Sequence, residues 1–219
     1  MGKLGFQTRL GLVFAAILAA FWVWQNPGVT GSRLGHDEIE RYLAVIDRAA
    51  PMAPAEKAEA ITRIRAWAQA DDGKPVYMLN LMRFFPKVKS VPGGPDAGMT
   101  PMQSNQRYED AVLPMLLTKG GTAVITSTSQ GANVLPYAGQ EDNWNRMLVI
   151  RYPNRRAFLE LLSDPAYHKE MPYKLAALEI ILSPFSKEMV LPDPSLALAT
   201  ILLIAFLTIG WWRAARRTR

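Results

Sequence analysis

Polar residues on otherwise apolar predicted strands are the first candidates for chemistry in this chain. Asn80 and Arg83 stand in the run VYMLNLMRF at 76–84, and Arg151 stands in the run RMLVIRY at 146–152. A charged side chain on an apolar strand is costly unless it meets a carboxylate, a ligand or solvent at the strand's end. Nearby segments add aromatic and imidazole groups, and the full set is Asn80, Arg83, Tyr108, Trp144, Arg151, Tyr167 and His168.

This set is the best candidate in the sequence for a small-ligand site. We predict that six of its members line a space between the sheet and a partner: Asn80, Arg83, Tyr108, Trp144, Arg151 and Tyr167. Arg83 and His168 are the candidates for catalysis, because an imidazole titrates near neutral pH and can act as a general base. Simpler alternatives stay open: the arginines pair with acidic residues of the domain, and His168 lies on the surface in the first turn of a helix.

Other kinds of chemistry have no support in the sequence. The chain has no cysteine, and its two histidines, His36 and His168, are far apart, so we expect no metal and no thiol chemistry. No nucleotide-binding or nucleophile motif is present, and we expect no cofactor. The acidic pair Glu109-Asp110 is predicted to lie on the solvent side of a helix, since adjacent carboxylates do not converge as acid/base catalysis requires.

The elements that position these residues follow from periodicity and from proline and glycine. After a linker at 26–35, helices are predicted at about 37–50 and 55–70. From Pro75 onward the predicted order is strand 76–84, helix 104–119, strand 122–129, strand 146–152, helices from 155 and 164, and strand 179–185. Residues 133–137 are a candidate for a short hairpin arm. This β-α-β-β-α-β order predicts an α+β, ferredoxin-like antiparallel sheet with two extra N-terminal helices.

The first strand is apolar on both of its faces. Val76, Met78 and Met82 share one face, while Leu79 and Leu81 share the other. In a ferredoxin-like fold the helices cover only one face of the sheet, so the other face needs a second cover. The candidates are a second copy of the chain, packed sheet to sheet, or the two extra helices.

Several short motifs add a resemblance to a known family. They are VYMLNLMRF, Tyr108, Gly120-Gly121, Asn143-Trp144-Asn145-Arg146, Arg151-Tyr152-Pro153-Asn154-Arg155, Phe158, Asp164-Pro165-Ala166-Tyr167 and Ala176-Ala177-Leu178-Glu179. Together they make residues 74–187 similar to the family called domain of unknown function 1330, of the dimeric α+β barrel superfamily. The resemblance implies a ferredoxin-like fold that dimerises through its sheet, and it implies no reaction. The family's usual His-Arg and Trp-Asp pairs correspond here to Tyr173-Lys174 and Trp144-Asn145.

Charge and hydropathy set the central region apart from the two ends. Residues 26–193 contain all 19 acidic residues and 19 of the 25 basic ones, so the net charge of +6 comes from the two ends. Uncharged apolar runs lie at 10–24 and 195–212, or ~22 Å and ~27 Å of helix against a hydrocarbon layer of ~30 Å. Basic residues flank both runs, which predicts two transmembrane helices with both termini in the cytoplasm and does not favour nucleic-acid binding.

We therefore expect a cytoplasmic tail (1–9), a transmembrane signal anchor (10–25), a linker with two helices (26–73), the ferredoxin-like domain (74–190), a second span (194–212) and a basic tail (213–219). A cleaved signal peptide is the alternative for the first run. Either way the domain lies outside the cytoplasm, in a bacterial inner membrane protein with a periplasmic domain.

The function predicted from these features is that of a non-catalytic accessory or scaffolding subunit. Its partners are the lipid bilayer and other membrane subunits or a second copy of the chain. A small-residue stripe at Gly11, Ala15 and Ala19 is suited to close helix packing in a membrane. The alternatives are a tethered module that binds a small ligand and a tethered enzyme resembling the monooxygenases or isomerases of the superfamily.

Overall fold

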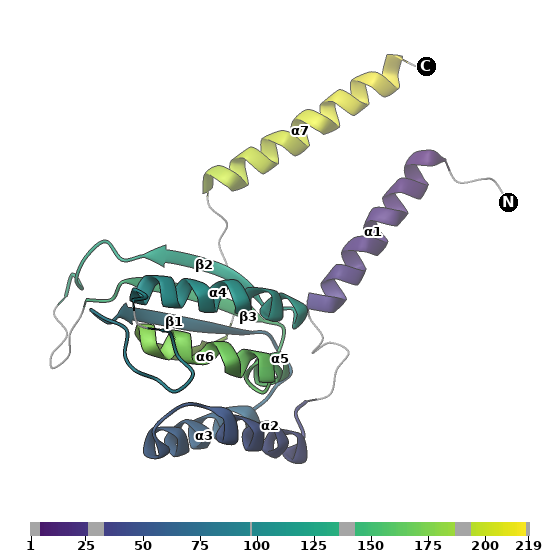
Figure 1. Ribbon diagram of the computed structural model, residues 1–219. Helices are drawn as coiled ribbons and strands as arrows, with labels where there is room; N and C mark the ends of the chain where they lie inside the picture. The colour runs from purple at the N-terminus through teal and green to yellow at the C-terminus, as the bar shows by residue number, and fades with distance from the viewer. Residues whose placement is uncertain (1–4, 26–32, 97, 136–142, 187–193, 218–219) are drawn as a thin grey trace. The chain divides into compact units, whose positions relative to one another are not determined.

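The computed structural model describes residues 5–25, 33–96, 98–135, 143–186 and 194–217, in two units, Met1–Ser186 and Lys187–Arg219 (Figure 1). The first unit contains α1 (Phe6–Gln25), α2 (His36–Ala49), α3 (Pro54–Gln69), β1 (Val76–Phe84), α4 (Pro101–Thr118), β2 (Thr122–Thr128), β3 (Arg146–Tyr152), α5 (Arg155–Leu162), α6 (Pro165–Ala177) and β4 (Leu178–Phe185). The second unit contains α7 (Pro194–Arg217). The predicted order of elements in the α+β domain is confirmed.

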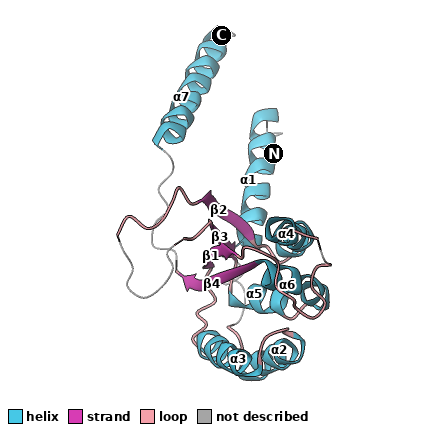
Figure 2. Cartoon of the chain, turned by 60° about the vertical axis from the view of Figure 1, so that its left-hand side comes forward, coloured by secondary structure: helices cyan, strands magenta, loops and turns pink. Residues whose placement is uncertain are grey.

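The four strands form one antiparallel sheet in the order β2-β3-β1-β4. In the centre of the sheet, Leu79 of β1 pairs with Val149 of β3 on one side and with Ser183 of β4 on the other. The helices α4, α5 and α6 lie together on one side of this sheet (Figure 2). This is the ferredoxin-like arrangement that the sequence predicts.

The strand β1 separates two environments by the parity of its residues. Val76, Met78, Asn80 and Met82 are buried beneath the helices. The intervening residues point to the other side of the sheet, which we call the open face, and are only partly buried. Asn80 therefore stands under the helical layer, while Arg83 stands on the open face.

The two N-terminal helices extend the helical layer. Ile39, Leu43 and Ile46 form the buried stripe of α2 and join the same core as Phe158 of α5. The guanidinium of Arg156 on α5 also binds the carboxylate of Glu38 on α2, at 2.7 and 3.1 Å. The expectation that these helices cover the open face is therefore wrong, because their apolar stripe is used against α5.

Local details depart from the sequence prediction at two places. Within the helix predicted from residue 164, the proline at 172 predicts an interruption, but α6 runs through Pro172 without a break and buries it. A proline inside a helix removes one hydrogen bond, and packing of the surrounding turn can offset that loss. In the predicted hairpin arm at 133–137, the described residues 133–135 form no strand, and residues 136 and 137 lie outside the described residues.

The α7 segment Pro194–Arg213 is long and apolar enough to cross a bilayer, judged by length and composition. In α1 the apolar stretch Thr8–Trp24 is shorter than such a span requires. The structure thus supports one of the two predicted transmembrane helices.

Candidate functional site

A cavity of about 260 Å³ lies between the helix-covered side of the sheet and the helices α4 and α6. Its walls are mostly apolar, with Met78, Val112, Leu116, Leu148, Ile150 and Phe158 among them. Most exposed members of the lining mark an opening between α4 and β2, namely Gln106, Asp110 and Leu113 on α4 and Ala123 and Thr126 on β2, and Leu182 on β4 is exposed as well. Further polar groups of the lining come from four elements: Asn80 on β1, Tyr108 and Glu109 on α4, Arg146 on β3, and Tyr167 and Lys174 on α6.

Asn80 sits on the floor of the cavity and is 2 % exposed. Its amide nitrogen donates to the backbone carbonyls of Met78, at 3.1 Å, and of Leu148, at 3.4 Å. Its side-chain oxygen accepts a hydrogen bond from the ammonium group of Lys174 at 3.2 Å. A rotation of the amide by 180° would point two donors at the ammonium, so these partners fix its orientation.

Lys174 is the cation at the inner end of the cavity. It lies near the end of α6, and its ammonium nitrogen is 5.0 Å from the centre of the Tyr108 ring. Burial lowers the pKa of Lys174 to about 8, against an ordinary value of 10.5. Glu109 acts in the opposite direction on this pKa, and Arg146 reinforces the lowering. Groups whose pKa is shifted by burial are enriched at functional sites, which makes Lys174 a candidate site residue.

Two tyrosines form the wall beside Lys174. The hydroxyl of Tyr108 donates to the hydroxyl of Tyr167 at 3.3 Å, and the ring centres lie 6.1 Å apart at 72°. Both side chains are 7 % exposed. Burial raises the pKa of each phenol, so both are neutral and act as hydrogen-bonding groups.

The ion pair of Glu109 and Arg146 closes another side of the cavity. One guanidinium nitrogen of Arg146 donates to both carboxylate oxygens of Glu109, at 2.6 and 2.8 Å. A second nitrogen reaches the hydroxyl of Thr126 at 3.4 Å, and the amide of Asn105 donates to Glu109 at 2.9 Å. The prediction that Glu109 lies on the solvent side of its helix is wrong, because Arg146 on β3 draws it inward.

A second hollow of about 620 Å³ lies on the other side of Arg146. It is lined by Phe84, Met102, Asn105, Gln106, Thr128, Ser129, Gly131, Ala132, Asn143, Trp144, Asn145 and Arg146. Gln106 and Arg146 belong to both linings. The side-chain oxygen of Asn105 is buried here without a hydrogen-bond partner among the described residues.

Arg83 and Arg151 lie on the open face, on the opposite side of the sheet from the cavity. Arg83 forms an ion pair with Glu179 of β4 and donates to the side chain of Asn143 at 3.1 Å. Its guanidinium carbon lies 5.7 Å from the centre of the Trp144 ring. Arg151 stands opposite Tyr77 of β1 and Thr122 of β2. Arg83 thus has the carboxylate partner that the simpler interpretation required.

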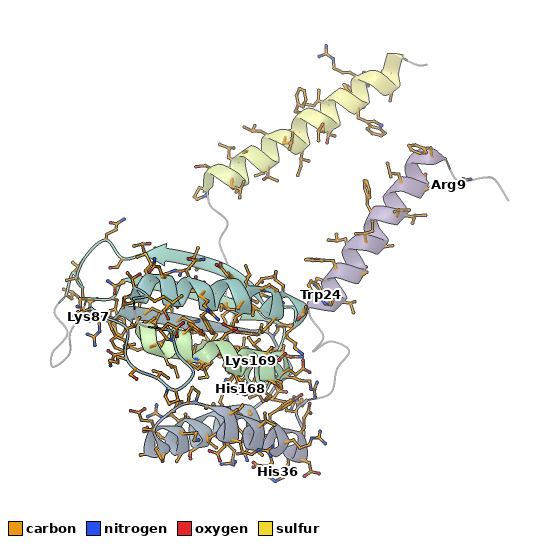
Figure 3. The ribbon with its side chains drawn as sticks, in the orientation of Figure 1. Arg9, Trp24, His36, Lys87, His168 and Lys169 are labelled. Atoms are coloured by element: carbon orange, nitrogen blue, oxygen red, sulfur yellow. The ribbon has the colours of Figure 1, made fainter. Side chains whose placement is uncertain are left out.

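His168 packs behind the cavity wall, with its ring centre 6.1 Å from that of Tyr167. Both of its ring nitrogens are buried, and neither has a hydrogen-bond partner among the described residues. Burial lowers the pKa of His168. The other histidine, His36, lies on α2 (Figure 3), and the described residues contain no group of three metal-ligating side chains.

The structure therefore divides the predicted set. Asn80, Tyr108 and Tyr167 come together around the cavity, while Arg83, Trp144 and Arg151 lie elsewhere and His168 lies behind Tyr167. Lys174, Glu109 and Arg146 complete the site and were missed as site residues. The available signals were the departure of Tyr173-Lys174 from the family pattern and the arginine at the first position of the 146–152 strand.

Comparison with solved structures supports the fold. The chain is similar to RPA0582, a protein of unknown function from Rhodopseudomonas palustris, with a TM-score of 0.50, 22% identity, and coverage of 60% of this chain and 94% of that one. The methylated form of RPA0582 gives a TM-score of 0.50, 25% identity, and coverage of 60% and 91%. SnoaB, a cofactor-independent oxygenase from Streptomyces nogalater, gives a TM-score of 0.35 with 13% identity over 55% of this chain and 99% of that one, a similarity too low to support an argument.

No family model and no curated protein matches the chain. The structural similarity to RPA0582 thus supports the α+β fold with its four-stranded antiparallel sheet, and the family resemblance of the sequence motifs stays a prediction.

Proposed function

We propose that this chain is a membrane-tethered domain that binds a small, largely apolar molecule in the cavity beneath α4 and α6. The observation that carries the proposal is a cavity with apolar walls into which Asn80, Tyr108 and Lys174 direct a few polar groups. Small-molecule sites typically combine an apolar lining with a small number of placed polar groups.

The size of the cavity limits the ligand. At about 260 Å³ it falls just below the ~300 Å³ at which typical ligand pockets begin. A molecule of one substituted ring suits this volume. Its expected route of entry lies between α4 and β2, where most of the exposed members of the lining are found.

Cavity-filling mutagenesis tests this proposal. Val112 is 7 % exposed and lines the cavity, so Val112→Phe should occupy the space that a ligand needs. The matched control is Val149→Phe, which adds the same group on the open face. We expect ligand-observed NMR with the full chain in detergent to detect binding of one-ring probes such as toluene and 4-methylphenol, lost in Val112→Phe and kept in Val149→Phe. Equal binding by both variants would refute the proposal, as would the absence of binding of every one-ring probe, neutral or charged, to the unmodified chain.

A second candidate function, that of an accessory or scaffolding subunit, draws support from the open face. Ile125, Ile181 and Phe185 are 49%, 42% and 53% exposed on it, next to Leu79 and Leu81. Exposed apolar patches of this kind commonly mark protein interfaces. A second copy of the chain or another membrane subunit is the expected partner. Native sizing after gentle extraction tests this, because a chain that migrates alone would contradict it.

Membrane attachment rests on α7, and the remaining features are proposals of ours. They are a second span in α1, a bacterial inner membrane location, cytoplasmic termini and a periplasmic domain. Basic residues flank both apolar segments, as the positive-inside rule requires of cytoplasmic ends. Membership of the family called domain of unknown function 1330 and an enzyme activity of the monooxygenase or isomerase type belong with these proposals.

A further inference from the structure

The charged groups around the cavity are only partly paired with one another. Arg146 and Glu109 pair with each other through two hydrogen bonds, at 2.6 and 2.8 Å. Tyr108 and Tyr167 are neutral, and Asp110 lies exposed at the opening, where it accepts a hydrogen bond from Gln106. The remaining cation, Lys174, forms no ion pair with either carboxylate of the lining, Glu109 or Asp110.

The partner that Lys174 does have is neutral. Its ammonium group carries three donor hydrogens, and the side-chain oxygen of Asn80 accepts one of them. The ring of Tyr108 lies beside the ammonium and supplies a weak, non-directional attraction. Donors of the ammonium group thus remain for a ligand in the cavity.

The polar groups near Lys174 also favour a ligand that accepts hydrogen bonds. The amide nitrogen of Asn80 is held by two backbone carbonyls, so the amide cannot turn to accept a ligand's donor in place of the lysine's. The hydroxyl of Tyr108 donates to that of Tyr167, which leaves the Tyr167 proton to be donated onward. The inner end of the cavity is therefore rich in donors, while the remaining walls are apolar.

We propose that the ligand of this cavity is a small apolar carboxylic acid, bound with its carboxylate on the ammonium group of Lys174 and its apolar body among Val112, Leu116 and Ile150. This inference rests on the proposed function and specifies its ligand class. An ammonium–carboxylate contact of this kind is a charge-assisted hydrogen bond, stronger than one between neutral groups.

Three probes of the same shape test the inference: 4-methylbenzoate, 4-methylbenzamide and 4-methylbenzylamine, which are negative, neutral and positive at pH 7. With the full chain in detergent, we expect the acid to bind at least tenfold more tightly than the amide, and the amine to bind most weakly. Lys174→Met should remove the preference for the acid. The matched control is Lys169→Met, on an exposed residue of the same helix (Figure 3), and it should keep that preference.

A pH series on the unmodified chain tests the same point without a substitution. The ionisable groups that line the site are Tyr108, Glu109 and Asp110 from α4, Arg146 and Tyr152 from β3, and Tyr167 and Lys174 from α6. Of these, Lys174 is the group that should lose its charge between pH 7 and 9.5, so binding of 4-methylbenzoate should weaken over this range while binding of 4-methylbenzamide stays level.

The outcomes separate this inference from the proposed function. If the amide binds as well as the acid, the carboxylate inference is wrong and the cavity remains a binding site for neutral molecules. If Lys174→Met keeps the preference for the acid, the assignment of the carboxylate to Lys174 is wrong and the cavity remains a binding site. If neither these three probes nor toluene and 4-methylphenol bind, both proposals are wrong.

Discussion

The ammonium group of Lys174 and the side-chain oxygen of Asn80 are 3.2 Å apart, although the two residues are separated by 94 positions in the sequence. This hydrogen bond joins the end of α6 to the middle of β1 across the base of the cavity. It holds a cation in an apolar enclosure by means of a neutral group, so the cation stays available to a ligand. The predictions below follow from this arrangement and from the groups around it.

Replacing Lys174 should change how stability depends on pH. The pKa of Lys174 falls from 10.5 to about 8 on folding, so between these values the unfolded chain binds more protons than the folded one. Stability should therefore rise as the pH increases from 8 to 10, by up to about 3 kcal/mol. Urea unfolding of the domain at pH 8 and pH 10 measures this rise. Lys174→Met should lack it, and a rise of the same size in this variant would contradict the assignment.

Replacing Asn80 should destabilise the fold. Asn80→Leu removes the acceptor of the lysine and the donor of two buried backbone carbonyls. The two carbonyls keep their places in the inner strands of the sheet, but the ammonium of Lys174 loses its acceptor, so we expect a loss of about 1–3 kcal/mol in the free energy of unfolding. The control is Asn133→Leu on an exposed residue, which should change stability by less than ~0.5 kcal/mol. Equal effects of the two changes would refute this role of Asn80.

The ion pair of Glu109 and Arg146 should contribute more to the stability of the fold than an exposed ion pair does. The side chains of Arg146 and Glu109 are 26% and 22% exposed, whereas those of Arg63 and Glu59 are 78% and 64% exposed. Glu109→Gln leaves a partly buried guanidinium without its counter-charge and should cost about 1–3 kcal/mol. Glu59→Gln should cost less than ~0.5 kcal/mol. Chemical denaturation of both variants measures the two losses in free energy of unfolding, and the difference between them should decrease little in high salt.

His168 should make the fold sensitive to mild acid. Burial lowers its pKa below the ordinary 6.5, so the unfolded chain takes up a proton more readily than the folded one as the pH falls. Stability should therefore drop between pH 7 and pH 5, and His168→Gln should reduce that drop. The matched control is His36→Gln on an exposed histidine, which should leave the drop unchanged. Thermal unfolding at both pH values measures the difference.

The order of elements could be predicted from the sequence because apolar periodicity and proline and glycine positions are local signals. The run VYMLNLMRF and the caps Asn154 and Asp164 mark their elements without reference to the rest of the chain. Pro172 could not be judged in this way, since the packing that holds its turn in α6 comes from residues distant in sequence.

The site was predicted only in part for a similar reason. Asn80, Tyr108 and Tyr167 are polar or aromatic residues on apolar elements, and this contrast identified them. Glu109 stands beside Asp110, and Lys174 stands four residues after Glu170, so both match the pattern of an ordinary solvated helix face. Their inward placement depends on Arg146 and Asn80, which the sheet brings near through strand pairing that no local pattern reveals.

The alternation along β1 gives the nine residues of this strand two separate tasks. Val76, Met78, Asn80 and Met82 face the helical layer, and Tyr77, Leu79, Leu81 and Arg83 face the other way. Under the two proposed functions, substitutions at Met78 and Asn80 would act on the cavity, and substitutions at the odd-numbered positions would act on the open face. A single insertion within β1 would reverse the facing of every residue after it and so disturb both sides of the sheet at once.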